Sequence, residues 1–260
     1  MLDTITFGIL GSGMLGRAIA QGLLRGGMPA AKLWLANRSG TPVPLEGGAG
    51  VTFTADPQIM ARACDAVLLC LPPAAMAGLR IDLSDRLVLS VVAGLSLERM
   101  VAQTGAQRVI RAMSNPAAAQ GLAYTPWIAG AGATAQDRAL AAGLFDAIGA
   151  QDELTREAHI DDFTALTGPV PGFVACFAES MIRHAVSRGI PEPVATRAIR
   201  QLFHASGEML AEGKTPATHV REMVEYGGTT AAGILRLRGS AFDAALSAAL
   251  TAATERARSL

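Results

Sequence analysis

Gly11, Gly13 and Gly16 form a G-x-G-x-x-G motif between the apolar run Ile5–Leu10 and the helical stretch Arg17–Arg25. A strand, a glycine turn and a helix in this order bring backbone N–H groups and the positive end of a helix dipole to one point. A dinucleotide pyrophosphate can bind there. The motif therefore predicts a dinucleotide-binding domain, and its candidate cofactor ligands are Gly11, Ser12, Gly13, Met14, Leu15 and Gly16.

Strand-like and helical segments alternate along the first part of the chain. Helical stretches such as Gln136–Ala147 lie between short apolar runs, and the predicted strands are Ile5–Leu10, Lys32–Ala36, Ala66–Leu71, Leu87–Val92, Arg108–Met113 and Ala123–Ile128. This alternation is typical of a parallel, doubly wound α/β sheet. The apolar character of Ala66–Leu71 and Leu87–Val92 suits strands that are buried on both faces.

The strand pattern stops at about His159, and helices follow to the end of the chain. Glycines and prolines mark their ends and starts, and the predicted helices are Phe173–Arg188, Pro193–Glu212, Thr218–Tyr226, Thr229–Arg236 and Phe242–Ser259. We therefore expect a Rossmann-type domain at residues 1–156 and an all-helical domain at residues 157–260. The alanine-rich last helix has more apolar surface than one packing face needs, which favours a homodimer or a higher homo-oligomer.

The amino-acid composition excludes some classes of partner and favours one cellular compartment. Half of the 260 residues are hydrophobic, and Lys+Arg and Asp+Glu balance at 22 each, so we expect neither nucleic acid nor a membrane surface as a partner. No run reaches the roughly 18 apolar residues of a spanning helix. The N-terminal stretch lacks the basic residues that begin a signal peptide, so we do not expect one. Three widely spaced cysteines, without a disulfide or CxxC pattern, favour the cytoplasm. The histidines lack metal-ligand spacing, so no metal is predicted.

The residues after the second predicted strand bear on cofactor choice. An NAD site would have Asp or Glu roughly 20 residues past the glycine loop, to accept from the ribose 2′-hydroxyl. This chain has Asn37, Arg38 and Ser39 there. Arg38 can pair with a 2′-phosphate and Ser39 can donate to it, which favours NADPH over NADH. The alternative is an ordinary exposed arginine in a loop.

A second glycine turn, Gly227-Gly228-Thr229-Thr230, precedes a helical run near the C-terminus. In one interpretation it is a flexible turn in which a threonine caps the helix. In the other, its exposed N–H groups bind a substrate carboxylate and the Thr230 hydroxyl bonds a substrate heteroatom. The candidate substrate-binding residues are Gly227, Gly228, Thr229 and Thr230.

The chain resembles the pyrroline-5-carboxylate reductase family along nearly its whole length. Several separate motifs in the right order are more specific than any one of them. They are the glycine loop, Leu71-Pro72-Pro73, Val91-Val92-Ala93-Gly94-Leu95-Ser96, Arg111-Ala112-Met113-Ser114-Asn115, Thr164-Ala165-Leu166-Thr167-Gly168-Pro169 and Gly227–Thr230.

The resemblance implies a Rossmann domain, a helical dimerisation domain and hydride transfer from NAD(P)H to the C=N carbon of a cyclic imino acid, giving proline. It also implies an active site where two subunits interleave, with the amides of the Gly227–Thr230 turn on the carboxylate and Thr230 beside the ring nitrogen. Further cofactor contacts are expected at Leu71, Pro72, Ala93 and Gly94, with Asn115 at the nicotinamide end.

The chain departs from the family pattern beside the substrate turn. The family usually has Ser-Pro where this chain has Glu225-Tyr226. Glu225 would repel a carboxylate unless it points to solvent or pairs with a base such as Arg221. Alternatively, Glu225 and Tyr226 act in recognition and catalysis on a different imine, with Tyr226 as the proton donor.

Other departures lie elsewhere in the chain. Met14 and Pro57 replace asparagines of the family, while Met113–Ala117 and Gly168–Phe173 differ from the motifs usual there. We expect cofactor binding to survive the first two changes, because backbone amides do most of that work. The others put the identity of the substrate in doubt.

The expected function is therefore NADPH-dependent reduction of 1-pyrroline-5-carboxylate to L-proline. Two alternatives remain open at this point. One is reduction of another imine, such as a six-membered homologue. The other is a nucleotide-binding protein without catalysis. A β-hydroxyacid dehydrogenase fits less well, because the helix Phe173–Arg188 lacks the catalytic lysine of that class.

Overall fold

A computed structural model describes residues 2–211 and 213–259. These residues form two compact units. The first unit comprises the chain up to Val170 together with the segment from Ala252 onward, and the second unit is Pro171–Thr251. The predicted domain boundary between residues 156 and 157 stays a prediction, and the outermost residues of both predicted domains, 1 and 260, lie outside the described part.

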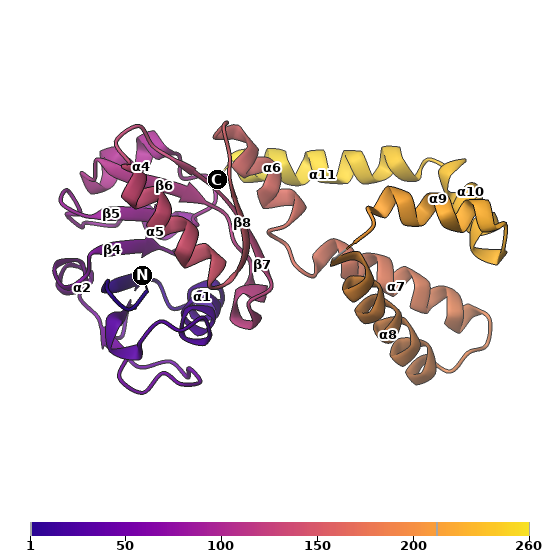
Figure 1. Ribbon diagram of the computed structural model, residues 1–260, viewed down its shortest axis with the longest axis horizontal. Helices are drawn as coiled ribbons and strands as arrows, with labels where there is room; N and C mark the ends of the chain where they lie inside the picture. Colours follow the sequence, from indigo (N-terminus) through magenta and orange to yellow (C-terminus); the bar gives the residue numbers. More distant parts are fainter. Residues whose placement is uncertain (1, 212, 260) are drawn as a thin grey trace. The chain divides into compact units, whose positions relative to one another are not determined.

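The first unit contains one eight-stranded sheet in the order β3-β2-β1-β4-β5-β6-β7-β8. Neighbouring strands are parallel except β6 and β7. Figure 1 shows β4, β5 and β6 side by side in this sheet. The strands are β1 Phe7–Leu10, β2 Leu33–Ala36, β3 Thr52–Thr54, β4 Ala66–Leu69, β5 Leu87–Ser90, β6 Arg108–Ala112, β7 Ala123–Ala129 and β8 Gly149–Glu153.

Helices connect these strands and cover the sheet. They are α1 Met14–Arg25, α2 Pro57–Ala63, α3 Pro73–Met76, α4 Leu97–Thr104, α5 Ala135–Asp146 and α6 Ala158–Leu166, with the short 3₁₀ helices η1 Ala30–Lys32 and η2 Pro116–Gln120. The predicted α/β class is confirmed, and the predicted strands agree with β1, β2 and β4–β7 to within two residues at each end.

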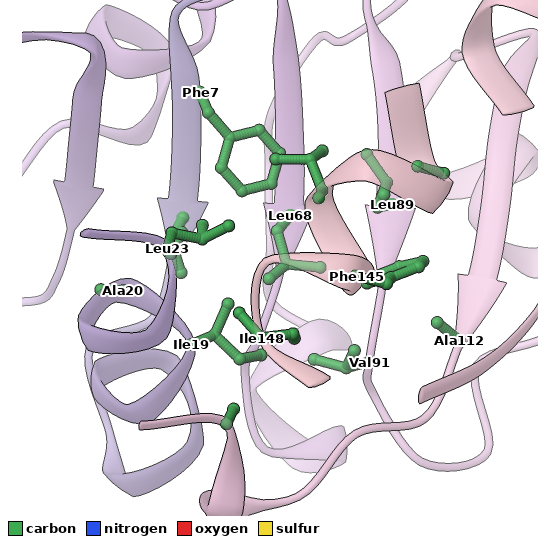
Figure 2. Packing of buried hydrophobic residues seen from close by; sticks show 14 of the residues in the cluster. Phe7, Ile19, Ala20, Leu23, Leu68, Leu89, Val91, Ala112, Phe145 and Ile148 are labelled. Carbon is green, nitrogen blue, oxygen red and sulfur yellow. The ribbon is translucent and has the colours of Figure 1, made fainter. Parts of the chain in front are cut away.

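Each face of the sheet has its own apolar core, because alternate residues of a strand point to opposite faces. Leu68 of β4 lies in a cluster with Phe7 and with residues of α1 and α5, while Val67 and Leu69 lie in a second cluster with residues of α2 and α4. Figure 2 shows members of the first cluster, among them Ile19 and Leu23 of α1 and Phe145 of α5. Burying one such leucine contributes about 1.5–3 kcal/mol.

Two strands and one direction differ from the sequence prediction. β3 has only three residues, two of them threonine, and β8 ends in Gln151-Asp152-Glu153, so neither edge strand has an apolar run. β7 runs antiparallel to β6. The segment between Ala112 and Ala123 holds only the five-residue η2, which is too short for the helical crossover that a parallel return needs.

The C-terminal helices agree with the predicted ones. They are α7 Gly172–Ser187, α8 Glu192–Ala211, α9 Pro216–Tyr226, α10 Thr229–Arg238 and α11 Phe242–Arg258 (Figure 1). The predicted end of α8 at Glu212 lies outside the described residues. α11 runs through the second unit up to Thr251 and ends in the first.

Few side chains of the second unit are buried. Phe177 of α7 meets Phe203 of α8 with ring centroids 6.1 Å apart. Large apolar side chains nevertheless stay exposed, among them Met209 at 65% and Val174 at 55%. An exposed apolar surface of this kind is typical of a face that packs against another molecule. Within the described residues, no helix has both the length and the apolar character to cross a membrane.

Candidate dinucleotide and substrate sites

The glycine loop joins β1 to α1, and two of its glycines are required by the fold itself. Gly11 has a φ of +110°, and a Cβ there would lie 2.2 Å from the carbonyl oxygen of Cys70. A Cβ on Gly16 would lie 1.9 Å from the carbonyl oxygen of Gly11. The Gly11 N–H donates to the Ala36 carbonyl at 2.8 Å, which ties the loop to the end of β2.

Gly13 differs from the other two, because a Cβ there would meet no atom within 4 Å. Gly13 is the N-cap of α1, and no side chain caps this helix end. Internal packing therefore does not require a glycine here, whereas close approach of a ligand to the backbone would. The loop fits a dinucleotide pyrophosphate, which the free N–H groups and the dipole of α1 would hold.

The other loop residues divide into exposed and packed ones. Met14 is 78% exposed at the first position of α1, and Ser12 is half-buried. Leu15 packs against the first core cluster. Leu15 can therefore offer a ligand only its backbone, while Ser12 and Met14 can offer side chains.

The sheet order places this loop at a topological switch point. From β1 the chain continues to β2 and β3 on one side and later to β4 and β5 on the other. Ligands of doubly wound sheets bind outside the carboxyl ends of the strands at such a point. Leu71 and Pro72 follow β4, while Ala93 and Gly94 follow β5. All four residues therefore lie at the carboxyl ends of the parallel strands, where the glycine loop also lies. The Gly94 carbonyl accepts from Arg99 Nη1 at 2.9 Å.

Asn37 and Ser39 shape the turn after β2. The Ser39 hydroxyl donates to Asn37 Oδ1 over 3.1 Å and accepts from the Thr41 N–H, and Asn37 Nδ2 donates to the Thr41 carbonyl at 2.8 Å. Arg38 is exposed and has neither a hydrogen bond nor an ion pair within the described part of the chain. Its guanidinium is therefore available to a phosphate, whereas the Ser39 proton already has an acceptor.

Asn115 lies after β6 and is 2% exposed. Its Oδ1 accepts from the Ala117 N–H at 3.0 Å and its Nδ2 donates to the Thr167 carbonyl at 3.1 Å. These bonds fix η2 and the C-terminal end of α6. The structure thus gives Asn115 a positioning role, and its predicted contact with the nicotinamide end stays a prediction.

Arg111 of β6 forms an ion-pair cluster that the sequence analysis did not assign. Its Nη1 lies 3.0 Å from a carboxylate oxygen of Glu157, and its Nη2 pairs with Asp161 of α6. Glu157 also accepts from the Leu97 N–H at 2.8 Å. Arg111 is 4% exposed, so the cluster ties α6 firmly to the sheet. These partners lie 46 and 50 residues from Arg111, and local spacing cannot reveal such pairs.

The substrate turn joins α9 to α10. Gly227 has a φ of +71° and ends α9, and Gly228 is the N-cap of α10. Thr229 and Thr230 are therefore the first two residues of α10, so the interpretation of a threonine N-cap is wrong. No side chain caps α10. The N–H groups of its first turn remain available to an anion.

Glu225 and Tyr226 end α9 beside this turn. Glu225 Oε1 lies 3.9 Å from Arg221 Nε, one helical turn earlier. Both side chains are about two-thirds exposed, and such a pair is weak. The Tyr226 side chain is 87% exposed, and a Cβ on Gly228 would lie 3.2 Å from its ring. The ring thus lies against the turn, with its hydroxyl open to a ligand.

The described residues contain no group of three or more His, Cys, Asp and Glu side chains that could hold a metal ion. The charged groups of both candidate sites are arginines and one glutamate. The arginines can bind anionic groups, and the glutamate carboxylate can accept a proton.

Comparison with known proteins decides the family. Residues 157–260 match the model for pyrroline-5-carboxylate reductase dimerisation, and residues 6–94 match the model for NADP oxidoreductase, coenzyme F420-dependent. Over 268 residues the chain is 30% identical to the pyrroline-5-carboxylate reductase of Arabidopsis thaliana, which covers 99% of this chain and 96% of the relative. The chain belongs to the pyrroline-5-carboxylate reductase family.

Solved structures of pyrroline-5-carboxylate reductases have the same fold. The structure from Coxiella burnetii superposes with a TM-score of 0.87 at 24% identity and covers 99% of this chain and 98% of its own. The Plasmodium falciparum pyrroline carboxylate reductase, with NADP bound, gives a TM-score of 0.80 at 21% identity, with 99% and 98% covered.

The predictions of the family, of an NAD(P)H-dependent oxidoreductase and of an NADP cofactor are confirmed. The match of residues 157–260 to a dimerisation family indicates a homo-oligomer. The individual site residues stay predictions.

Proposed function

We propose that this protein reduces 1-pyrroline-5-carboxylate to L-proline with NADPH held on the Gly11–Gly16 loop. Membership of the pyrroline-5-carboxylate reductase family supports the proposed reaction, and the geometry of the loop supports the proposed cofactor site. Gly13 is the decisive residue there, because the fold leaves its backbone open to a ligand at the uncapped start of α1. When bound, NADPH supplies the hydride.

The chain's own residues bind and orient the cofactor. Backbone N–H groups of Ser12, Gly13, Met14, Leu15 and Gly16 surround the pyrophosphate, while Gly11, whose own N–H donates to the Ala36 carbonyl, provides the tight turn before them. Arg38 pairs with the 2′-phosphate, and Asn37 and Ser39 hold the turn that presents it. Leu71, Pro72, Ala93 and Gly94 border the ribose and nicotinamide side. NADH remains a weaker second cofactor, because it shares every contact except the 2′-phosphate.

The Gly227–Thr230 turn binds the imino acid. Its first-turn N–H groups and the helix dipole receive the substrate carboxylate, and the Thr230 hydroxyl bonds the ring nitrogen. Binding at both points orients the C=N carbon. The protein needs no covalent nucleophile for this reaction, because orientation and charge placement are its contribution.

The Tyr226 hydroxyl is the proposed proton donor. An imine accepts hydride best when its nitrogen carries a proton, and a phenol within reach of the turn can donate one directly or through water. Glu225 lies next to it, with Arg221 reducing the repulsion between its carboxylate and an anionic substrate.

Glu225 and Tyr226 also favour a second candidate, the reduction of a different imine. An exposed phenol and a carboxylate beside the turn suit a substrate with an extra polar or cationic group. A non-catalytic NADP-binding protein has no such support from the geometry.

The helical domain, proposed as residues 157–260, carries the subunit interface. Its exposed apolar side chains, such as Met209 and Val174, are the surface that a second copy would cover. A dimer is the smallest assembly that does so. We also propose the cytoplasm as the compartment and residues 1–156 as the cofactor domain.

A panel of imines tests the substrate. NADPH consumption is measured with 1-pyrroline-5-carboxylate, its six-membered homologue and the 2-carboxylate isomers of both, and each product is identified by mass. We expect kcat/KM for 1-pyrroline-5-carboxylate to exceed that for each other imine by at least about tenfold, or about 1.4 kcal/mol of transition-state binding. A higher kcat/KM for another imine would make that one the substrate.

A further inference from the structure

A hollow of about 520 Å³ opens beside the first turns of α1. The glycine loop and α1 form its floor, with η2 on one side and the segment after β2 on the other. Its lining residues include Ser12, Gly13, Met14, Arg17, Val43 and Pro44. Because Gly13 belongs to it, the hollow reaches the open start of α1.

Gln21 holds one wall of this hollow in place. Its Nε2 donates to the Glu46 carbonyl at 3.1 Å, and its Oε1 accepts from the Glu46 N–H at 2.8 Å. The segment that contains Val43 and Pro44 is thereby fixed against α1. The hollow is formed by the fold before any ligand binds.

Arg17 is the only charged residue among the described residues that line this hollow. Its N–H donates to the Gly13 carbonyl at 2.9 Å, so it lies one helical turn beyond Gly13. Helical side chains lean toward the N-terminus and cover the preceding turn. The Arg17 side chain is exposed and makes neither a hydrogen bond nor an ion pair in the described part of the chain.

We propose that Arg17 is a further cofactor-binding residue, whose guanidinium pairs with the pyrophosphate of the dinucleotide at Gly13. The inference rests on the proposed cofactor site. The helix dipole supplies only about half a charge, while a pyrophosphate carries two negative charges. An arginine can bind phosphate oxygens through two parallel N–H donors. Arg38, which follows β2, instead serves the 2′-phosphate.

The two arginines therefore make different predictions for the two dinucleotides. NADH and NADPH share the pyrophosphate, and only NADPH has the 2′-phosphate. Loss of Arg17 should weaken both cofactors by the same factor, while loss of Arg38 should weaken NADPH alone. Arg25 is a matched control, since it lies two turns further along α1, is exposed and is also without a partner in the described part.

The experiment is a fluorescence titration of the full-length protein with NADPH and with NADH. It compares the wild type with Arg17→Gln, Arg17→Lys, Arg38→Gln and Arg25→Gln. We expect Arg17→Gln to raise Kd about tenfold for both cofactors, which is the size of a charge-assisted hydrogen bond. Arg17→Lys should recover part of this loss, and Arg25→Gln should match the wild type.

An unchanged Kd of Arg17→Gln for both cofactors would overturn the proposal while leaving the proposed function intact. A loss confined to NADPH would also overturn it, because Arg17 would then bind the 2′-phosphate. Failure of the wild type to bind either dinucleotide would instead reject the cofactor site, and this inference with it.

Discussion

Arg111 and Glu157 form an ion pair with 3.0 Å between Nη1 and Oε1, and Asp161 binds the other end of the same guanidinium. Arg111 is almost fully buried at the carboxyl-terminal half of β6, and Asn115 follows it in the chain. The cluster thus connects the sheet edge of the cofactor site with α6, whose C-terminal end Asn115 also holds.

Replacement of Arg111 by Met should destabilise the protein strongly. Two carboxylates then lose a buried partner, and breaking such a pair costs about 3–5 kcal/mol. Chemical denaturation measures the change in the free energy of unfolding. The control is Arg258→Gln, which breaks the exposed ion pair between Arg258 and Asp162 of α6. This substitution should cost less than about 1 kcal/mol. Equal effects of the two variants would contradict the structural role of Arg111.

Gly16→Ala and Gly13→Ala should separate folding from cofactor binding. The alanine at 16 would clash with the Gly11 carbonyl, and overpacking of this kind costs about 1–3 kcal/mol or more. The alanine at 13 meets nothing within 4 Å and should cost about 1 kcal/mol as a poorer N-cap. Its Kd for NADPH should nevertheless rise about tenfold or more. A Gly13→Ala variant that binds NADPH normally would contradict the assignment of the loop.

How far the sequence predicts the structure depends on whether the evidence for each feature is local. The β1–loop–α1 unit is predictable because apolar runs and glycines mark it within twenty or so residues. The ion pairs of Arg111 are not, since their partners are distant in sequence. The direction of β7 depends on the short connection through η2, and the edge strands β3 and β8 lack apolar runs. One interpretation of the sequence makes a threonine the cap of α10, because threonine is a common N-cap residue, but Gly228 takes this position in the structure.

Thr230→Ala tests the substrate turn. The variant loses the hydroxyl proposed to bond the ring nitrogen but keeps every backbone N–H group. We expect kcat/KM for 1-pyrroline-5-carboxylate to fall about tenfold or more, while Kd for NADPH stays within about twofold. Steady-state kinetics and a cofactor titration measure the two quantities. Equal losses in both would show that Thr230 does not lie at the substrate.

Tyr226→Phe tests the proton donor. Phenylalanine keeps the ring against Gly228 and removes only the hydroxyl. We expect kcat to fall by about 10² or more, the usual contribution of general acid catalysis. The kcat of Tyr226→Phe is compared with that of Glu225→Gln, because the second variant removes a charge from the adjacent position and keeps the Tyr226 hydroxyl. A loss of less than about threefold in Tyr226→Phe would reject its role as proton donor.

The thiols of Cys64 and Cys70 should be inert in the folded protein. Burial raises the pKa of each to about 12, so the reactive thiolate is scarce near neutral pH. The neutral thiols contribute stability that is present below about pH 9 and is lost as the pH rises toward 12. At pH 8, mass spectrometry after alkylation should find Cys176, which is exposed, modified before the other two. Rapid modification of Cys64 or Cys70 without unfolding would contradict this.

The most direct test of the account follows a deuterium atom. NADPH deuterated at the transferable position of the nicotinamide is incubated with the protein and 1-pyrroline-5-carboxylate, and the product is analysed by mass spectrometry and NMR. The account predicts L-proline with one deuterium on the former C=N carbon, formed in proportion to the NADPH consumed. Binding of NADPH without proline formation, or proline without the deuterium, would contradict it.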